Sequence, residues 1–166
     1  MKTALATAFL LAATSAQAGF VARFVEGAPK DTFVIEAAPG ACATGPLSVT
    51  FDLTGSDGKL IFDVTDAGAG VEVFQPFELV RGAERVTAFS DVTDGDTLLR
   101  LEVSDLSETE QVAFTIDVDD TIGAREITVG RSEIVGASVT VSDGTTTATG
   151  VFDTSATTAI TWPDCA

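Results

Sequence analysis

Three carboxylates lie within four residues of the sequence, at Asp117, Asp119 and Asp120. They end an alternating run of apolar residues that comprises Val112, Phe114, Ile116 and Val118. Apolar residues at every second position are typical of a strand with one buried face. The alternation directs Asp117 and Asp119 together to the opposite face and leaves Asp120 at the exit of the strand.

Calcium is the ion that suits this cluster best. Carboxylates this close repel one another unless a cation or hydrogen-bond donors neutralise them. Ca²⁺ accepts roughly six to eight oxygen ligands in loose geometry, which aspartates and loop carbonyls supply without histidine or cysteine. The sequence therefore predicts a calcium site at Asp117, Asp119 and Asp120. The alternative is a solvated strand end, because similar acidic stretches also occur on exposed surfaces.

A second acidic loop spans residues 91–96 and contains Asp94-Gly95. It lacks the residue order and the distal glutamate of a helix-loop-helix calcium site. An Asp-Gly pair favours a turn without any metal, so we interpret this loop mainly as a turn.

The sequence is poor in catalytic residues. The chain contains no histidine and no tyrosine, which removes the commonest general base and every histidine-based triad. Asp117 or Asp119 could pair with Glu72 or Glu78 as the acid and base of a glycosidase. Such enzymes usually present aromatic platforms to the sugar, however, and the chain has one tryptophan. We expect no enzyme, and a carbohydrate-active enzyme is the least favoured alternative.

The N-terminus has the pattern of a secretory signal peptide over residues 1–18. Met1-Lys2 precedes an apolar run at residues 4–13, and Ala16-Gln17-Ala18 forms a small-x-small cleavage site before Gly19. The run is shorter than the roughly 20 residues of a transmembrane helix. We therefore expect export to the periplasm or the extracellular space, without membrane insertion.

Two cysteines, Cys42 and Cys165, follow the predicted signal peptide. In an oxidising compartment a disulfide between them is the natural inference, and two unpaired thiols are the alternative. By closing a very long loop, the bond would contribute up to roughly 4–5 kcal/mol.

Acidic residues dominate the composition. The chain has 25 acidic and nine basic residues and a net charge of −16, and loss of Lys2 with the signal peptide would make it −17. Such a field repels nucleic acid and anionic lipid and favours cations or basic partners. The alternative is that the acidity serves solubility alone.

Residues 19–166 are predicted to form one all-β domain, an antiparallel β-sandwich of jelly-roll or Greek-key type with about ten short strands. Turn signals recur at roughly the 8–12-residue spacing of such folds, and Asp143-Gly144 is a strong hairpin signal. The expected strands include residues 20–26, 32–37, 47–53, 59–64, 84–90, 99–103, 112–118, 126–129 and 133–141.

A glycine-rich passage follows the expected strand at residues 59–64. Glycines at this density indicate unusual backbone angles or a close backbone approach. If the acidic cluster proves to be solvated, this segment is the next candidate for an interaction surface. Its candidate residues are Gly68, Gly70, Glu72, Phe74, Gln75 and Phe77.

Three segments taken together resemble the core protein of sponge aggregation factors (the wreath-type domain) and its bacterial homologues. They are RFVEGAPKDTFVIE at residues 23–36, KLIFDVTDAGAGVEVFQPFELV at residues 59–80 and FTIDVDDT at residues 114–121. The resemblance implies an extracellular, calcium-associated adhesion or assembly module. The chain lacks the calcium-binding β repeats and glycan-bearing regions of the sponge proteins, so the resemblance does not extend to cell–cell aggregation.

The leading hypothesis is an exported, calcium-associated adhesion or assembly module that associates with itself or with a protein or glycan of the cell envelope or extracellular space. The alternative from a different class is a metal-independent structural or protein-interaction domain of the cell envelope.

Overall fold

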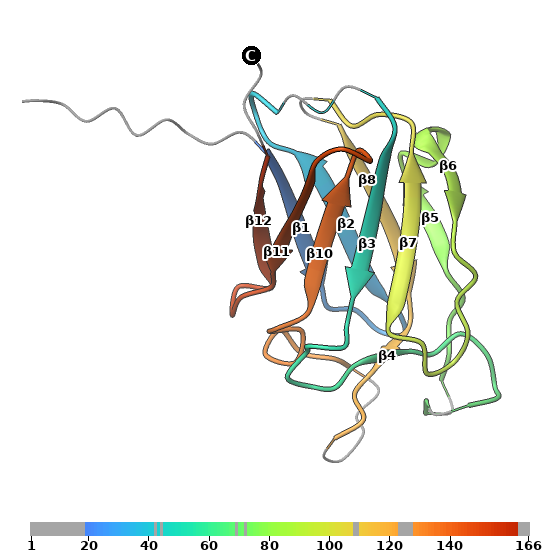
Figure 1. Ribbon diagram of the computed structural model, residues 1–166. Coiled ribbons are helices and arrows are strands. Elements are labelled where there is room, and N and C mark those ends of the chain that lie inside the picture. The colour runs from blue at the N-terminus through green and yellow to red at the C-terminus, as the bar shows by residue number, and fades with distance from the viewer. Residues whose placement is uncertain are drawn as a thin grey trace, which may run out of the picture.

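The computed structural model describes residues 19–162 except residues 42, 44, 69, 72, 108–109 and 123–127. These residues form twelve strands and one short 3-10 helix. Ten strands form two five-stranded antiparallel sheets packed face to face (Figure 1). The predicted all-β sandwich is therefore confirmed. The predicted signal peptide, both cysteines (Cys42 and Cys165) and Glu72 lie outside the described residues.

The first sheet has the order β12 (Thr157–Thr161), β1 (Gly19–Val25), β2 (Asp31–Ala37), β8 (Gln111–Ile116) and β5 (Glu78–Arg81). The second has the order β11 (Thr147–Val151), β10 (Ser138–Ser142), β3 (Leu47–Asp52), β7 (Leu98–Val103) and β6 (Val86–Phe89). β4 (Ile61–Phe62) and β9 (Val118–Asp119) form a small separate sheet. In Figure 1, β4 lies at the lower end of the sandwich.

The core follows from period-two alternation on facing strands. The inward residues of β3 and β7 are each at most 2% exposed, and they are Leu47, Val49, Phe51, Leu99, Leu101 and Val103. Phe33 lies at the centre of an aromatic cluster, with its ring centroid 5.2 Å from that of Phe114 and 5.4 Å from that of Phe51. Packing of these large rings supplies much of the hydrophobic stabilisation.

β5 and β6 are the edge strands on one lateral side of the sandwich, and the 3-10 helix η1 (Ala83–Arg85) connects them (Figure 1). Both strands carry a register shift, between Leu79 and Arg81 in β5 and between Val86 and Ala88 in β6. Such irregularities twist an edge away from further strand pairing. The structure thus blunts both edges on this side.

Several predicted strands are shorter than expected. Within residues 59–64 only Ile61–Phe62 is a strand, and residues 83–85 of the edge connection form η1. Residues 131–136 form turns before β10 because Gly136 adopts a φ of 89° and the Glu133 carboxylate accepts a hydrogen bond from the Gly130 amide, 2.6 Å away. Within the predicted strand at residues 126–129, residues 128–129 are not in a strand, and residues 126–127 lie outside the described part.

The hairpin predicted at Asp143-Gly144 is confirmed. It joins β10 to β11 through four loop residues, 143–146, and Gly144 has a φ of 86°. In the described part of the chain, no helix is long and apolar enough to cross a membrane.

Candidate metal centre

Asp63 and Asp117 face each other where the small sheet meets β8. β4 pairs antiparallel with β9, with Phe62 opposite Val118 and Ile61 opposite Asp119. The Asp63 amide donates to the Asp117 carbonyl oxygen at 3.1 Å, which extends the pairing by one residue. Side chains directly opposite in an antiparallel pair project to the same face, so Asp63 joins the face expected for Asp117 and Asp119.

These carboxylates are buried. The exposed fractions are 1% for Asp63, 3% for Asp117 and 1% for Asp119, and Asp31 at the start of β2 is 2% exposed. Asp120 directly follows β9 and is 6% exposed. Burial disfavours the charged form of a carboxyl group unless charge or hydrogen bonds compensate it. A solvated strand end therefore does not describe this region.

The electrostatics link four of the carboxylates. Burial, together with the negative charges of Asp119 and Asp63, raises the pKa of Asp117 from 3.8 to about 7. Burial likewise raises the pKa of Asp31 to about 8, against the lowering effect of its hydrogen bond from the Gly27 amide. The charges of Asp117 and Asp119 also raise the pKa of Asp31. We call Asp31, Asp63, Asp117 and Asp119 the carboxylate cluster.

Two oxygens of the carboxylate cluster have no hydrogen-bond partner, Oδ2 of Asp117 and Oδ1 of Asp119. The other carboxylate oxygen of Asp119, Oδ2, accepts a hydrogen bond from the Val71 amide at 2.6 Å, which fixes the direction of the side chain. Native proteins rarely leave buried acceptors without a donor, because the lost hydration is not replaced. These two oxygens are ready to accept a ligand.

A loop that we call the strap, residues 64–68, 70–71 and 73–76, covers the carboxylate cluster. A Cβ atom on Gly70 would lie 2.0 Å from both Cγ and Oδ2 of Asp63, so only glycine allows the backbone to pass this close. A Cβ on Gly68 would lie 2.3 Å from Cβ of Asp94. The glycine-rich sequence therefore reflects close approach to two carboxylates, as its density suggested.

Both ends of the strap are tied to the rest of the fold. Near its start, Oδ1 of Asp94 accepts hydrogen bonds from the Val64 and Thr65 amides at 2.7 and 2.9 Å, and the Thr65 hydroxyl donates to Oδ2. Near its end, the Gln75 amide donates to the Asp63 carbonyl at 3.3 Å, and the Gln75 carbonyl accepts from the Asp117 amide at 3.2 Å. The strap is thus bonded directly to the segments that carry the carboxylate cluster.

Hydrogen bonds to the strap explain the second acidic loop. The Thr65 hydroxyl, followed by the Val64 and Thr65 amides, lowers the pKa of Asp94. Residues 94–95 form a turn, and Gly95 has a φ of 88°. This loop therefore contains the predicted turn and also anchors the strap.

The residues predicted as a weak interaction surface have different roles. Gly68 and Gly70 make the close approaches to Asp94 and Asp63, and the backbone of Gln75 bridges Asp63 and Asp117. Phe77 is half-buried, with its ring 5.2 Å from that of Phe114 and 4.6 Å from that of Phe89. Phe74 is also half-buried.

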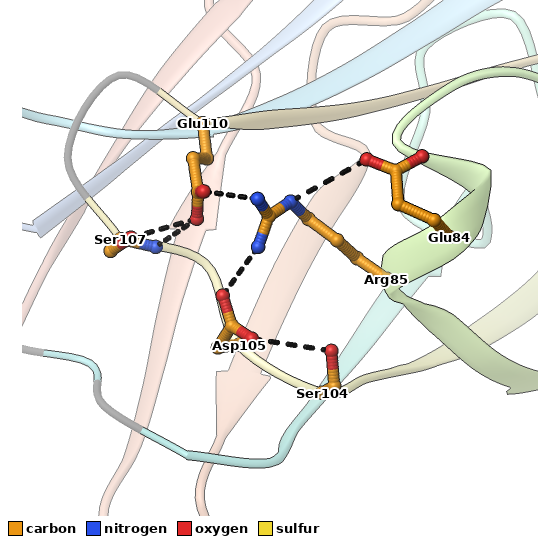
Figure 2. Close-up of polar contacts among 6 residues, drawn as sticks. All are labelled: Glu84, Arg85, Ser104, Asp105, Ser107 and Glu110. Carbon is orange, nitrogen blue, oxygen red and sulfur yellow. Dashed lines mark hydrogen bonds and ion pairs between the residues drawn. The ribbon is translucent and has the colours of Figure 1, made fainter.

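A second group of acidic residues shows what a compensated cluster looks like in this protein. Figure 2 shows the Arg85 guanidinium between Glu84, Asp105 and Glu110. Its Nη1 lies 2.5 Å from Oδ1 of Asp105, and Ser107 donates to Glu110 through both its amide and its hydroxyl. These hydrogen bonds from Ser107, together with the charge of Arg85, lower the pKa of Glu110. Here an arginine neutralises the carboxylates, whereas the charges that perturb Asp31 and Asp117 are all negative.

The donor chemistry of the carboxylate cluster is oxygen only, which suits Ca²⁺ and not a soft metal. In the described part of the chain, no three acidic side chains already converge as the ligands of an ion. Binding therefore requires the side chains to rotate toward a common centre. The pairing of β4 with β9 and its one-residue extension hold Asp63, Asp117 and Asp119 on neighbouring chain segments.

The sequence did not assign Asp31 to this region. Asp31 opens β2, opposite Ile116 of β8 in the register, and strand order alone brings it near Asp117. Asp63 follows the apolar run Leu60, Ile61 and Phe62 and precedes the glycines. That combination of a strand end, an aspartate and a glycine-rich loop is the sequence signal that points to Asp63. Asp120 remains a predicted ligand.

No protein-family model matches the chain, and no curated protein matches it.

Proposed function

We propose that the chain is an exported, non-catalytic β-sandwich module of adhesion or assembly that binds calcium at its carboxylate cluster. One observation carries the proposal: Oδ2 of Asp117 and Oδ1 of Asp119 are buried and without a hydrogen-bond partner, in a cluster where burial and neighbouring negative charge raise the pKa of Asp31 and Asp117. A divalent cation would supply both the missing partner and the missing positive charge.

The position of the cluster supports a structural role for the ion. Asp31 begins β2, Asp63 follows β4, Asp117 connects β8 to β9, and Asp119 ends β9. One ion shared by these side chains would cross-link three chain segments and the strap that Val71 ties to Asp119. Ions held in this way stabilise the folded state, because the ligands are dispersed in the unfolded chain.

Burial of the cluster favours the non-catalytic interpretation. Its carboxylates are 1–3% exposed, whereas a glycosidase must present its acid and base to a sugar. The resemblance of residues 23–36, 59–80 and 114–121 to the sponge aggregation factor core supports the assembly role and the extracellular or periplasmic location. The partner is a second copy of the chain or a protein or glycan of its surroundings.

Equilibrium calcium binding tests the proposal. Isothermal titration of Ca²⁺ into calcium-free protein should show saturable binding, with a dissociation constant in the range of extracellular modules, about 10⁻⁴–10⁻³ M. Asp117→Asn should abolish it. Asp57→Asn, which removes an exposed carboxylate and changes the net charge equally, should leave it intact.

Failure to bind Ca²⁺, or equal binding by both variants, would contradict the proposal. The alternative, a metal-independent structural or protein-interaction domain, would then describe the protein better.

A further inference from the structure

A groove of about 310 Å³ opens beside the strap, and its walls are largely apolar. The groove is lined by Val64 and Pro76 of the strap and by Phe77, the residue that follows it. It is also lined by Phe89 of β6 and by Asp91 and Val92 of the following loop. The groove therefore lies between the segment that precedes β5 and the end of β6, at the side of the sandwich formed by these two edge strands.

A row of aromatic rings leads from the core into this groove. Phe114 belongs to the core cluster, Phe77 lies 5.2 Å from it, and Phe89 lies 4.6 Å from Phe77. Phe89 is 51% exposed, whereas Phe77 is half-buried and Phe114 is 1% exposed. A half-exposed ring that is fixed from behind loses little conformational entropy on binding, which is the property of an anchor residue at an interface.

The carboxylate cluster and the groove share the strap. Val64 and Thr65 line the groove. Their backbone amides also donate hydrogen bonds to Asp94. Pro76, at the other end, follows Gln75, whose backbone is bonded to Asp63 and Asp117. Asp63 also directly precedes Val64 in the chain. Repulsion within the carboxylate cluster therefore acts next to both strap-derived walls of the groove, and an ion that relieves it would steady them.

The edges beside the groove are poorly suited to strand addition. β5 and β6 both carry register shifts, as described above. A partner that extends a sheet needs a regular, unpaired edge. The groove therefore points to docking of a side chain and not to addition of a strand.

Charge decides which occupant fits. Asp91 is the charged residue among those that line the groove, and the chain as a whole has a net charge of −16. Several basic side chains are already committed to ion pairs, as in Arg23 with Glu36, Lys30 with Glu78, and Arg100 with Glu102. A second copy would bring the same negative field to the interface, whereas a basic partner is attracted to it.

We propose that this groove docks an aromatic side chain presented by a basic segment of a partner protein, and that calcium at the carboxylate cluster strengthens the docking by fixing the strap. The calcium dependence rests on the proposed function, whereas the docking itself rests on the groove.

The test uses a fluorescently labelled peptide with one tryptophan flanked on each side by two lysines and a glycine. Binding to the purified chain is followed by fluorescence anisotropy in calcium and in excess EDTA. A peptide with alanine in place of tryptophan reports purely electrostatic attraction, and one with glutamate in place of lysine reports purely apolar docking. Both control peptides should bind at least about tenfold more weakly than the parent peptide.

Phe89→Ser and Leu98→Ser form a matched pair of variants. The two side chains are exposed to nearly the same extent, 51% and 52%, but Leu98 does not line the groove. Phe89→Ser should weaken peptide binding at least about tenfold, the usual effect of removing an aromatic anchor. Leu98→Ser should leave it unchanged. EDTA should weaken binding to the wild type, and Asp119→Asn in calcium should reproduce that loss.

Each contrary result has a distinct meaning. Equal binding by the Phe89→Ser and Leu98→Ser variants would overturn docking in the groove. If titration shows that the protein binds calcium but EDTA leaves the peptide affinity unchanged, the coupling between calcium and docking is overturned. The calcium site itself then still stands. A protein that binds the peptide through Phe89 but binds no calcium would contradict the proposed function alone. A dimer that Phe89→Ser dissociates, seen by light scattering, would make a second copy the occupant and overturn the basic partner.

Discussion

Replacing Asp119 with asparagine should stabilise the calcium-free protein and remove its response to calcium. Asparagine is nearly isosteric, and its amide oxygen can still accept the hydrogen bond that the Val71 amide gives to Oδ2 of Asp119. Its amide nitrogen would take the place of Oδ1, the oxygen without a partner. The substitution thus removes one negative charge from the carboxylate cluster and adds a donor to it.

The size of both effects follows from the electrostatics. Two like charges several ångströms apart in a partly buried site, with an effective dielectric constant of about 20, repel each other by roughly 1–3 kcal/mol. Calcium at about 100 times its dissociation constant stabilises a binding protein by about 2.7 kcal/mol. For a domain of this size that stabilisation raises Tm by roughly 5–11 °C.

Thermal unfolding at about pH 9, where Asp31 and Asp117 are ionised, measures both effects. In EDTA the Asp119→Asn variant should unfold at a higher temperature than the wild type, and in calcium the order should reverse. Asp57→Asn serves as the control, because Asp57 is exposed and the change in net charge is the same. The reasoning is refuted if Asp119→Asn lowers Tm in EDTA, or if its calcium-induced shift equals that of the wild type.

Three further predictions concern protons, the strap and the compensated cluster. In EDTA the free energy of unfolding should fall by a few kcal/mol from about pH 5 to about pH 9, because the raised pKa values of Asp31 and Asp117 make the folded state hold protons that the unfolded chain has released. Urea unfolding across this range checks it, and a flat or rising profile would contradict it. Gly70→Ala should weaken calcium binding more than about tenfold in a calorimetric titration, because its Cβ collides with a carboxylate of the cluster; Gly130→Ala, whose Cβ has its nearest neighbour at 3.5 Å, should bind normally. Arg85→Gln should lower Tm by a few degrees through loss of its ion pairs and leave calcium affinity unchanged; an altered affinity would mean that the two clusters are coupled.

Much of the fold could be predicted because strand alternation has a direct physical cause. Val112, Phe114, Ile116 and Val118 share one face, and all four are at most 1% exposed. The same holds for the alternating residues of β3 and β7. Strand ends were less predictable, as at Glu133, where a side-chain hydrogen bond to the Gly130 amide and the positive φ of Gly136 favour a turn over an extension of β10.

The candidate site could be predicted only in part. Period-two alternation correctly gave Asp117 and Asp119 a common face, but it could not tell whether that face would meet water. The strap covers it, and the route of the strap depends on contacts between Gly70 and Asp63 and between Thr65 and Asp94. Asp31 joins the cluster through the pairing of β2 with β8. These are long-range arrangements that local sequence patterns do not encode.

The most direct test of the central claim is an anomalous-difference map from crystals of the protein grown with calcium. The account predicts one strong peak between Oδ2 of Asp117 and Oδ1 of Asp119, with carboxylate oxygens of the cluster at roughly 2.3–2.6 Å from the ion. Such a peak would show that the unpartnered oxygens are calcium ligands. A map in which calcium occupies only surface positions, with both oxygens bonded to water or to protein donors, would contradict it.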